Sequence, residues 1–121
     1  MRRRKDDAAY LWDMLEASRT ALEVAGRYTR EEYDSDRLLR LAVERLVEII
    51  GEAARHVSPE CKQAHPEIPW QRADAQRHVL AHEYDIVDSN LMWVLITEDL
   101  ETLVAALEPL VPPGPSSEEP V

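Results

Sequence analysis

The chain has 121 residues, a length that suits one domain and is too short for two domains with separate hydrophobic cores. Phenylalanine is absent and glycine occurs three times, while 45% of the residues are hydrophobic and 31% are charged; this composition favours helices, disfavours an all-β fold and excludes a disordered chain. The net charge is −10, and since the basic run 2–5 adds +4, the rest of the chain carries −14, unlike a protein that coats nucleic acids through a basic surface.

A first helix is predicted over residues 6–25, because apolar side chains recur there every three or four residues and two aspartates stand at its positive end. The recurring apolar residues are Leu11, Met14, Leu15, Leu22 and Ala25. Gly26 is expected to end this helix. Thr29 and Glu32 have the spacing of a capping box, which predicts a short helix over 30–34.

A second long helix is predicted over 35–56, and its apolar stripe is wider than that of the first helix. A stripe of this width indicates burial on two sides, one against the rest of the bundle and one against a second subunit. The stripe consists of Leu38, Leu39, Leu41, Ala42, Val43, Leu46, Val47, Ile49, Ile50, Ala53 and Val57.

The second half of the chain predicts one short helix and two longer ones. Ser58 and Pro59 have the types expected at the start of a short helix that ends near residue 64, and a connector with two prolines follows over 65–70. A third main helix is predicted over 71–84. Asp88 or Ser89 is expected to cap a fourth main helix. Its apolar face would hold Leu91, Val94, Leu95, Leu100, Leu103, Val104 and Leu107.

These elements predict an all-α fold, an antiparallel bundle of four main helices plus short helices. We expect one helical domain over 1–111 and a disordered Pro/Ser/Glu tail over 112–121. No apolar run approaches the roughly 20 residues of a membrane helix, and the basic run 2–5 lacks the hydrophobic region of a signal peptide, so we expect a cytoplasmic protein without a membrane partner. Cys61 is the single cysteine and therefore cannot form an internal disulfide or a zinc knuckle.

The third predicted helix carries an unusual cluster of chemically active side chains. Arginine matches phosphate oxygens with a permanent forked charge, and histidine can carry a proton near neutral pH. These groups are the components of a metal-free site that cleaves phosphodiester bonds. The cluster is Arg77, His78, His82, Glu83, Tyr84 and Asp85.

Helical geometry leaves more than one interpretation of this cluster. At about 100° per residue, Arg77 and His82 would lie about 140° apart, so they cannot converge from one regular helix. The helix is distorted, or the arginine bends around it, or two subunits build the site together. Alternatively, His78 and His82 share one face with Asp85 close by, which is the spacing of a metal pair.

The string over 77–84 fits the pattern R-polar-x-x-x-H-x-Y and resembles the signature of the HEPN superfamily, most closely the HepT-like toxin ribonucleases. The resemblance covers residues 4–111 through further blocks at 4–15, 40–54, 58–70 and 80–88, which occur in the same order and spacing.

The resemblance implies a HEPN-like fold and a homodimeric toxin that cleaves RNA endonucleolytically without a metal or other cofactor, by attack of the 2′-hydroxyl. It assigns Arg77 and His82 as the catalytic pair and His78 to a supporting position, where the family usually has asparagine. It also implies a partner of the toxin–antitoxin pair, an MntA-type nucleotidyltransferase that inhibits the toxin by adding AMP to the motif tyrosine, here Tyr84.

A second hypothesis is a catalytically silent dimeric helical module that binds the nucleotidyltransferase partner. The family usually has a hydrophobic stretch with a glycine before the motif, whereas residues 72–76 of this chain are largely polar.

Overall fold

The computed structural model describes residues 6–71, 73 and 89–111, and every secondary-structure element within these residues is a helix. The predicted all-α class is therefore confirmed. Most of the third predicted helix, the basic run 2–5 and the predicted tail 112–121 lie outside the described residues. The elements are α1 (Asp7–Arg27), α2 (Arg30–Ser35), α3 (Arg37–His56), α4 (Pro59–Ala64), α6 (Ser89–Val94), the π-helix η1 (Leu95–Asp99), α7 (Leu100–Leu107) and the 3₁₀-helix η2 (Glu108–Leu110).

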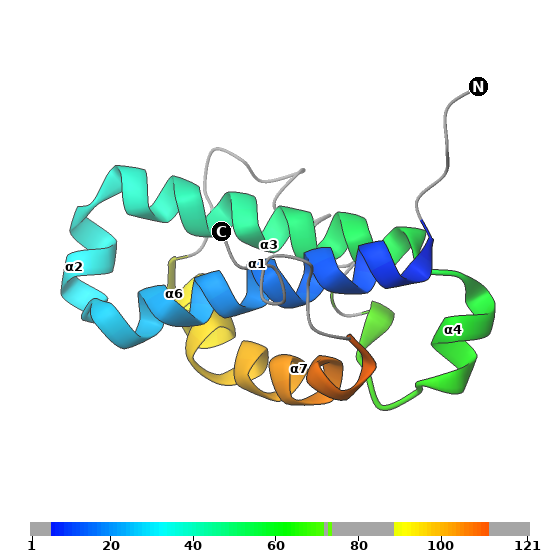
Figure 1. Cartoon of the computed structure of the whole chain (residues 1–121). Coiled ribbons are helices and arrows are strands. Elements are labelled where there is room, and N and C mark those ends of the chain that lie inside the picture. Colours follow the sequence, from blue (N-terminus) through cyan, green and yellow to red (C-terminus); the bar gives the residue numbers. More distant parts are fainter. Residues whose placement is uncertain (1–5, 72, 74–88, 112–121) are drawn as a thin grey trace, which may run out of the picture.

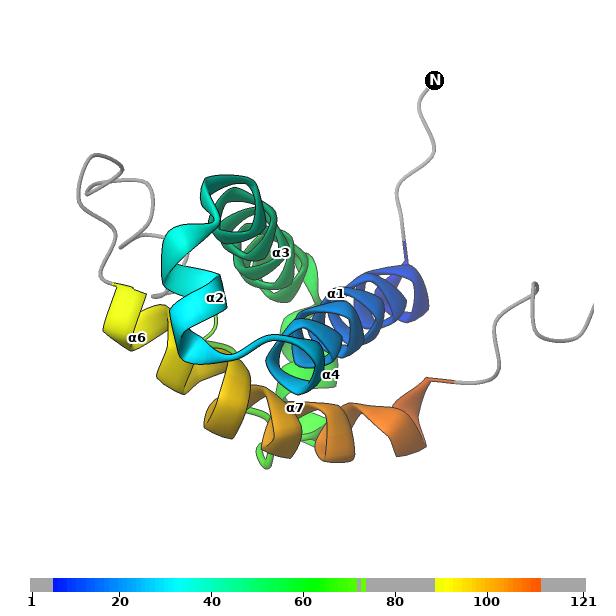
Figure 2. The ribbon, with the colours of Figure 1, turned by 90° about the vertical axis from the view of Figure 1, so that its left-hand side faces the viewer.

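Two long antiparallel helices set the shape of the described part of the molecule. Figure 1 shows α1 and α3 side by side. The short helix α2 connects them at one end, and α4 follows α3 at the other end. The continuous rod of α6, η1 and α7 lies beneath them, and α7 packs against α1. In the view along the helices, α1, α3 and this rod surround one common core (Figure 2). None of the helices in the described ranges is both long enough and apolar enough to cross a membrane.

The prediction that Gly26 ends the first helix is wrong, because α1 continues to Arg27. The helix ends where Tyr28 takes an extended backbone (φ −124°, ψ 146°), and the Tyr28 N–H still donates to the carbonyl oxygen of Val24. Gly26 does not have a positive φ, and a Cβ at this position would meet no atom within 4 Å.

The predicted capping box is confirmed at the start of α2. The Thr29 side chain accepts a hydrogen bond from the backbone N–H of Glu32 (3.1 Å), and the Glu32 carboxylate accepts one from the backbone N–H of Thr29 (2.9 Å). Helix α3 begins two residues later than predicted, because the Asp36 side chain caps it by accepting from the N–H of Leu39 (3.1 Å). Ser58 caps α4 as predicted.

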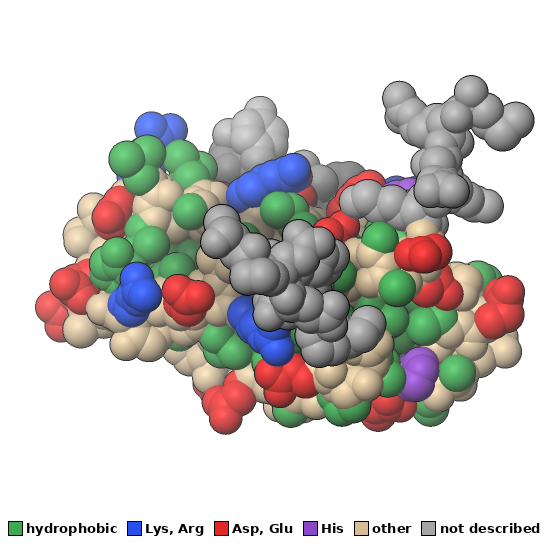
Figure 3. All heavy atoms as spheres, viewed as in Figure 1, with side chains coloured by type: hydrophobic (Ala, Val, Ile, Leu, Met, Phe, Trp, Pro, Cys, Tyr) green, Lys and Arg blue, Asp and Glu red, His purple; other side chains and the backbone are tan. Residues whose placement is uncertain are grey.

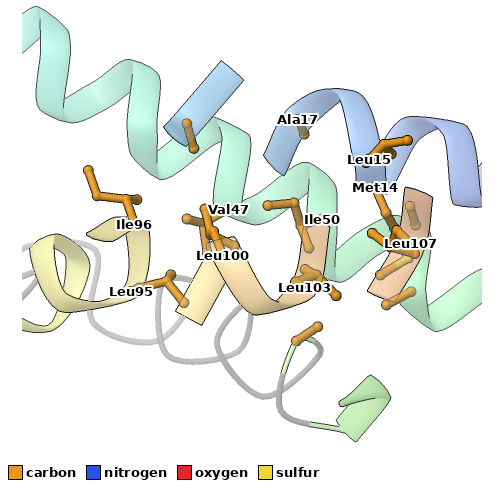
Figure 4. Packing of buried hydrophobic residues seen from close by; sticks show 14 of the residues in the cluster. Met14, Leu15, Ala17, Val47, Ile50, Leu95, Ile96, Leu100, Leu103 and Leu107 are labelled. Atoms are coloured by element: carbon orange, nitrogen blue, oxygen red, sulfur yellow. The ribbon is translucent and has the colours of Figure 1, made fainter. Parts of the chain in front are cut away.

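The core lies between α1, α3 and the α6–η1–α7 rod, and Figure 4 shows its side chains meeting from all three. The prediction that Leu91 and Val94 belong to the buried face of the last helix is wrong, since they are 58% and 37% exposed. Met92, which was not predicted on this face, is buried next to Leu91, whereas the predicted Leu95 is buried as expected. The residues that fill the core in Figure 4 include Met14, Leu15, Ala17, Val47, Ile50, Leu95, Ile96, Leu100, Leu103 and Leu107.

The apolar stripe of α3 is only partly covered by the described residues. Val43, Val47 and Ile50 are buried against the other helices. Leu38 is 78% exposed and Leu41 is 46% exposed. The side of the stripe for which the sequence predicts a second subunit thus carries exposed leucines.

A carboxylate ties the start of α1 to the start of α4. The Asp7 carboxylate accepts one hydrogen bond from the backbone N–H of Ser58 (2.8 Å) and one from its hydroxyl (2.6 Å). The same hydroxyl oxygen accepts from the N–H of Cys61 and so caps α4 (3.1 Å). The hydrogen bonds from Ser58 lower the pKa of Asp7. Because these hydrogen bonds favour the charged carboxylate, the clamp between the two helices depends on pH.

We therefore expect Asp7→Asn to lower the free energy of unfolding at pH 7 by about 1 kcal/mol, the usual net contribution of such a hydrogen bond. A lowered folded-state pKa means that the stabilisation is fully present above the unfolded value of about 3.9 and is lost as the pH falls through the folded-state value. Urea unfolding of both proteins from pH 7 to pH 2.5 should show the difference shrinking at the acid end. Glu60→Gln, at an exposed position of α4, is the control; a pH-independent difference for Asp7→Asn would contradict the clamp.

Candidate functional site

The residues of the predicted catalytic site lie outside the described part of the chain. This holds for the catalytic pair Arg77 and His82, for the supporting His78 and for Tyr84. It also holds for Asp85 of the alternative metal pair. Their roles therefore stay predictions, and the structure describes the residues that come before and after the segment in the chain.

The chain is fixed to the core immediately before this segment. The indole of Trp70 is buried, and its Nε1–H donates to the backbone carbonyl oxygen of His65 (3.0 Å). The Ala73 N–H donates to the carbonyl oxygen of Pro69 (3.1 Å), and Ala73 is 6% exposed. Trp70 thus packs into the core, and Ala73, the last described residue before the segment, is buried.

The chain is fixed again immediately after the segment. The Asn90 side-chain oxygen accepts a hydrogen bond from the guanidinium of Arg30 on α2 (3.0 Å). The Trp93 ring packs at a tilt on the ring of Tyr33, with 5.4 Å between centroids. Side chains of α2 therefore hold the start of α6.

Helices α2 and α3 place a cluster of charged side chains beside this anchor. The Arg30 Nε donates to both carboxylate oxygens of Asp34 (3.1 and 2.9 Å), and the Arg40 guanidinium donates to the backbone carbonyl oxygen of Asp34. Burial raises the pKa of the half-buried Glu44, while the nearby positive charge of Arg40 opposes this shift. The sequence analysis did not single out these residues; the signal was the i, i+4 pair Arg40 and Glu44 beside a predicted apolar stripe.

Tyr33 lies in the same region and carries a polar atom that the described residues do not satisfy. Its side chain is 0% exposed, and its hydroxyl has no hydrogen-bond partner among the described residues. Burial, aided by the negative charge of Glu44, raises the pKa of Tyr33 to about 12. Tyr33 therefore stays neutral at physiological pH.

A cavity of about 170 Å³ lies between α3, the chain at Pro69 and Ala73, and the η1–α7 rod. It is lined by Val47 and Ile50 of α3 and by Leu95, Leu100 and Leu103 of the rod. The cavity therefore borders the point at which the chain enters the predicted catalytic segment.

The two described histidines are poor candidates for this chemistry. His56 is exposed, lies 3.2 Å from the Glu52 carboxylate through its Nε2 and stacks on the Tyr10 ring with 5.3 Å between centroids. His65 lies 3.3 Å from the Glu67 carboxylate. No group of three or more His, Cys, Asp or Glu side chains in residues 6–71, 73 and 89–111 is arranged to hold a metal ion. Burial raises the pKa of the Cys61 thiol, which disfavours a reactive thiolate there.

Comparison with known proteins gives the class of this all-α protein. The family model described as "Ribonuclease HepT-like" matches residues 14–110, which include the motif segment 77–84. The chain therefore belongs to the ribonuclease HepT-like family, as the resemblance predicted.

Two relatives each match more than four fifths of the chain. The protein of Thermococcus cleftensis named "Probable ribonuclease HepT" is 36% identical over 102 residues, which are 81% of this chain and 93% of the relative. A protein of Methanocaldococcus jannaschii that carries a provisional RNase name is 30% identical over 105 residues, 87% of this chain and 96% of the relative. No solved structure is significantly similar to the chain.

Proposed function

We propose that this chain is an endoribonuclease of the HepT family that cleaves RNA without a metal ion and serves as the toxin of a type VII-like toxin–antitoxin pair. The observation that carries the proposal is the family match across residues 14–110, together with the motif that this match contains at 77–84. The RNase names of the relatives from Thermococcus and Methanocaldococcus support the activity.

The motif residues suit one reaction. His82 takes the proton of a ribose 2′-hydroxyl or delivers a proton to the leaving 5′-oxygen, with His78 as a second proton carrier nearby in sequence. The 2′-oxygen bonds to phosphorus as the bond to the 5′-oxygen breaks, which leaves a 2′,3′-cyclic phosphate and a 5′-hydroxyl. Arg77 holds the phosphate and stabilises the charge that develops on its oxygens.

The protein acts as a homodimer in this proposal. The sequence separates Arg77 and His82 by five positions, so groups from two copies of one regular helix can complement each other where one copy cannot. Exposed leucines at positions 38 and 41 of α3 offer an apolar surface for the second copy, and Leu91 and Val94 add exposed apolar area on α6.

The partner that restrains the activity is an MntA-like nucleotidyltransferase that transfers AMP to Tyr84. The bulky anion would occupy space beside the proposed phosphate site and would compete with the RNA phosphate for Arg77. The overall charge of −10 suits a partner with a basic surface. Figure 3 shows acidic side chains at both ends of one face of the molecule.

The wild-type protein should cleave RNA in the presence of EDTA and leave 2′,3′-cyclic phosphate ends. His82→Ala and Arg77→Ala should each reduce the rate by about 10²-fold or more, because each removes a group that acts in the transition state. His56→Ala removes an exposed histidine and should keep the wild-type rate. Cleavage that EDTA abolishes would contradict metal independence, and a folded wild type without any cleavage would favour the silent binding module.

Light scattering of the wild type at micromolar concentration should give the mass of a dimer. Leu38→Glu combined with Leu41→Glu should shift the mass toward the monomer, because charges would replace exposed apolar contacts, while the helical circular dichroism is retained. Ala105→Glu on α7 makes the same kind of change at another exposed position and should leave the dimer intact. A monomeric wild type would contradict the dimer.

Co-expression with the cognate nucleotidyltransferase should add one or more AMP units to the wild type and none to Tyr84→Phe, which lacks the acceptor oxygen. Intact-protein mass spectrometry measures the adducts. Tyr28→Phe, at an exposed tyrosine of the described region, should be modified like the wild type. Adducts that persist on Tyr84→Phe would place the modification at another residue.

A further inference from the structure

A shallow hollow lies where α1 passes into α2 and α2 into α3, at the end of the molecule that faces the viewer in Figure 2. Its volume is about 440 Å³, and every side chain that lines it is exposed to solvent. Sites for small ligands begin at about 300 Å³, so the hollow has room for one nucleotide. The residues that line it are Tyr28, Glu32, Ser35, Asp36, Arg37 and Leu38.

Tyr28 gives this hollow an exposed aromatic ring. The residue follows the last turn of α1 with an extended backbone, and its side chain is 40% exposed. Within the described ranges, no other tyrosine or tryptophan side chain is as exposed. Exposed aromatic rings beside a positive charge are the surfaces on which the bases of single-stranded nucleic acids stack. Tyr28 therefore offers a base a place to stack.

Arg37 gives the hollow a positive charge that is not used within the protein. Neighbouring arginines are engaged, since Arg30 pairs with Asp34 at 2.9 Å and Arg45 pairs with Glu48 at 2.7 Å. The Arg37 side chain is exposed and makes no hydrogen bond or ion pair with any part of the chain that the structure describes. A guanidinium group matches two phosphate oxygens at once. Arg37 is therefore available to a phosphate.

The stretch of chain that forms the hollow differs in charge from the rest of this acidic protein. Residues 27–45 contain five arginines and five acidic residues and are neutral overall. Residues 6–26 contain five acidic residues and one arginine, and residues 89–111 contain four acidic residues and no lysine or arginine. A phosphate backbone is repelled least where negative charges are balanced by arginines. The charge distribution thus favours RNA contacts at this end of the molecule.

Two carboxylates also line the hollow, and both take part in helix caps. The Glu32 carboxylate accepts a hydrogen bond from the N–H of Thr29 (2.9 Å), and the Asp36 carboxylate accepts one from the N–H of Leu39 (3.1 Å). Both lie at the start of a helix, where the positive end of the helix dipole offsets part of their charge. A carboxylate cannot donate to a phosphate, so a phosphate in the hollow is directed to Arg37.

We infer that this hollow binds one nucleotide of single-stranded RNA, with its base stacked on the Tyr28 ring and a phosphate held by Arg37. The inference rests on the proposed ribonuclease function, to which it adds a contact with the RNA substrate outside the predicted catalytic pair. Every base has a face that can stack, so the contact increases affinity for RNA with little sequence preference. Leu38 borders both the hollow and the proposed dimer surface, so each copy in a dimer presents its own hollow.

The test measures binding of a fluorescein-labelled 2′-O-methyl RNA decamer of mixed sequence to the full chain by fluorescence anisotropy. This RNA lacks the attacking 2′-hydroxyl, so the proposed reaction cannot cleave it. Tyr28→Ala should weaken binding about tenfold, because it removes the stacking ring. Tyr28→Phe keeps the ring and should bind like the wild type.

The salt dependence of binding tests the role of Arg37. Arg37→Ala should weaken binding and should make the slope of log affinity against log salt concentration shallower by about 0.7, the contribution of one phosphate of a single strand. Arg55→Ala removes another exposed arginine at the opposite end of α3 and should change neither quantity. Circular dichroism of all variants checks that the helices are retained.

Absence of RNA binding by the wild type, full affinity of Tyr28→Ala or an unchanged salt slope for Arg37→Ala would overturn the inference. A loss of the dimer in either variant, measured by light scattering, would assign the hollow to contact between copies and would overturn it too. RNA cleavage in EDTA by the wild type tests the proposed function separately. Cleavage with full affinity of Tyr28→Ala refutes the hollow alone, and binding that depends on Tyr28 without any cleavage refutes the enzyme alone.

Discussion

The fold depends on the burial of one face of α1 against one face of α3. Met14 and Leu15 of α1 and Val43 and Val47 of α3 are at most 2% exposed, and each fully buried side chain of this size contributes about 1.5–3 kcal/mol relative to an exposed one. The ion pairs of the surface are weak in comparison. Arg19 and Glu108 lie 2.9 Å apart with both side chains about half exposed, and such pairs contribute about 0–1 kcal/mol each. Apolar packing therefore determines where the third layer, the α6–η1–α7 rod, can lie.

This packing also sets the frame around the candidate site. The buried Trp70 and Ala73 fix the chain before the motif segment, and Arg30 and Tyr33 hold the start of α6 after it. The second anchor belongs to α2, which connects α1 with α3 and packs against α3. Along the chain, the predicted catalytic segment therefore lies between two points that contact the helical core.

The acidic composition and the proposed RNA substrate place opposite demands on the surface. Between Ser89 and Val111 the chain has no lysine or arginine, whereas Arg30 of α2 reaches the start of α6 through its hydrogen bond to Asn90. A negative surface keeps RNA from binding nonspecifically, because phosphate contacts supply most of such affinity. Binding of the RNA backbone is then confined to local arginines.

The sequence by itself determined the local features of this protein. The capping box at Thr29 and the cap at Ser58 were predictable because each joins groups only three residues apart. The motif at 77–84 is likewise a property of the sequence, and the family match supports it without describing its geometry. Periodicity alone predicted the long helices to within a few residues, although it placed the end of α1 at Gly26.

Only the tertiary structure decided which apolar side chains are covered and which polar groups meet. Leu38 and Leu91 belong to predicted apolar stripes and are exposed, because a helix buries only the face that a neighbour covers. Asp7 meets Ser58 across 51 positions of the chain, and the cavity draws its walls from three separate segments. Contacts between residues far apart in sequence depend on how whole helices pack, and no local pattern of residues encodes that arrangement.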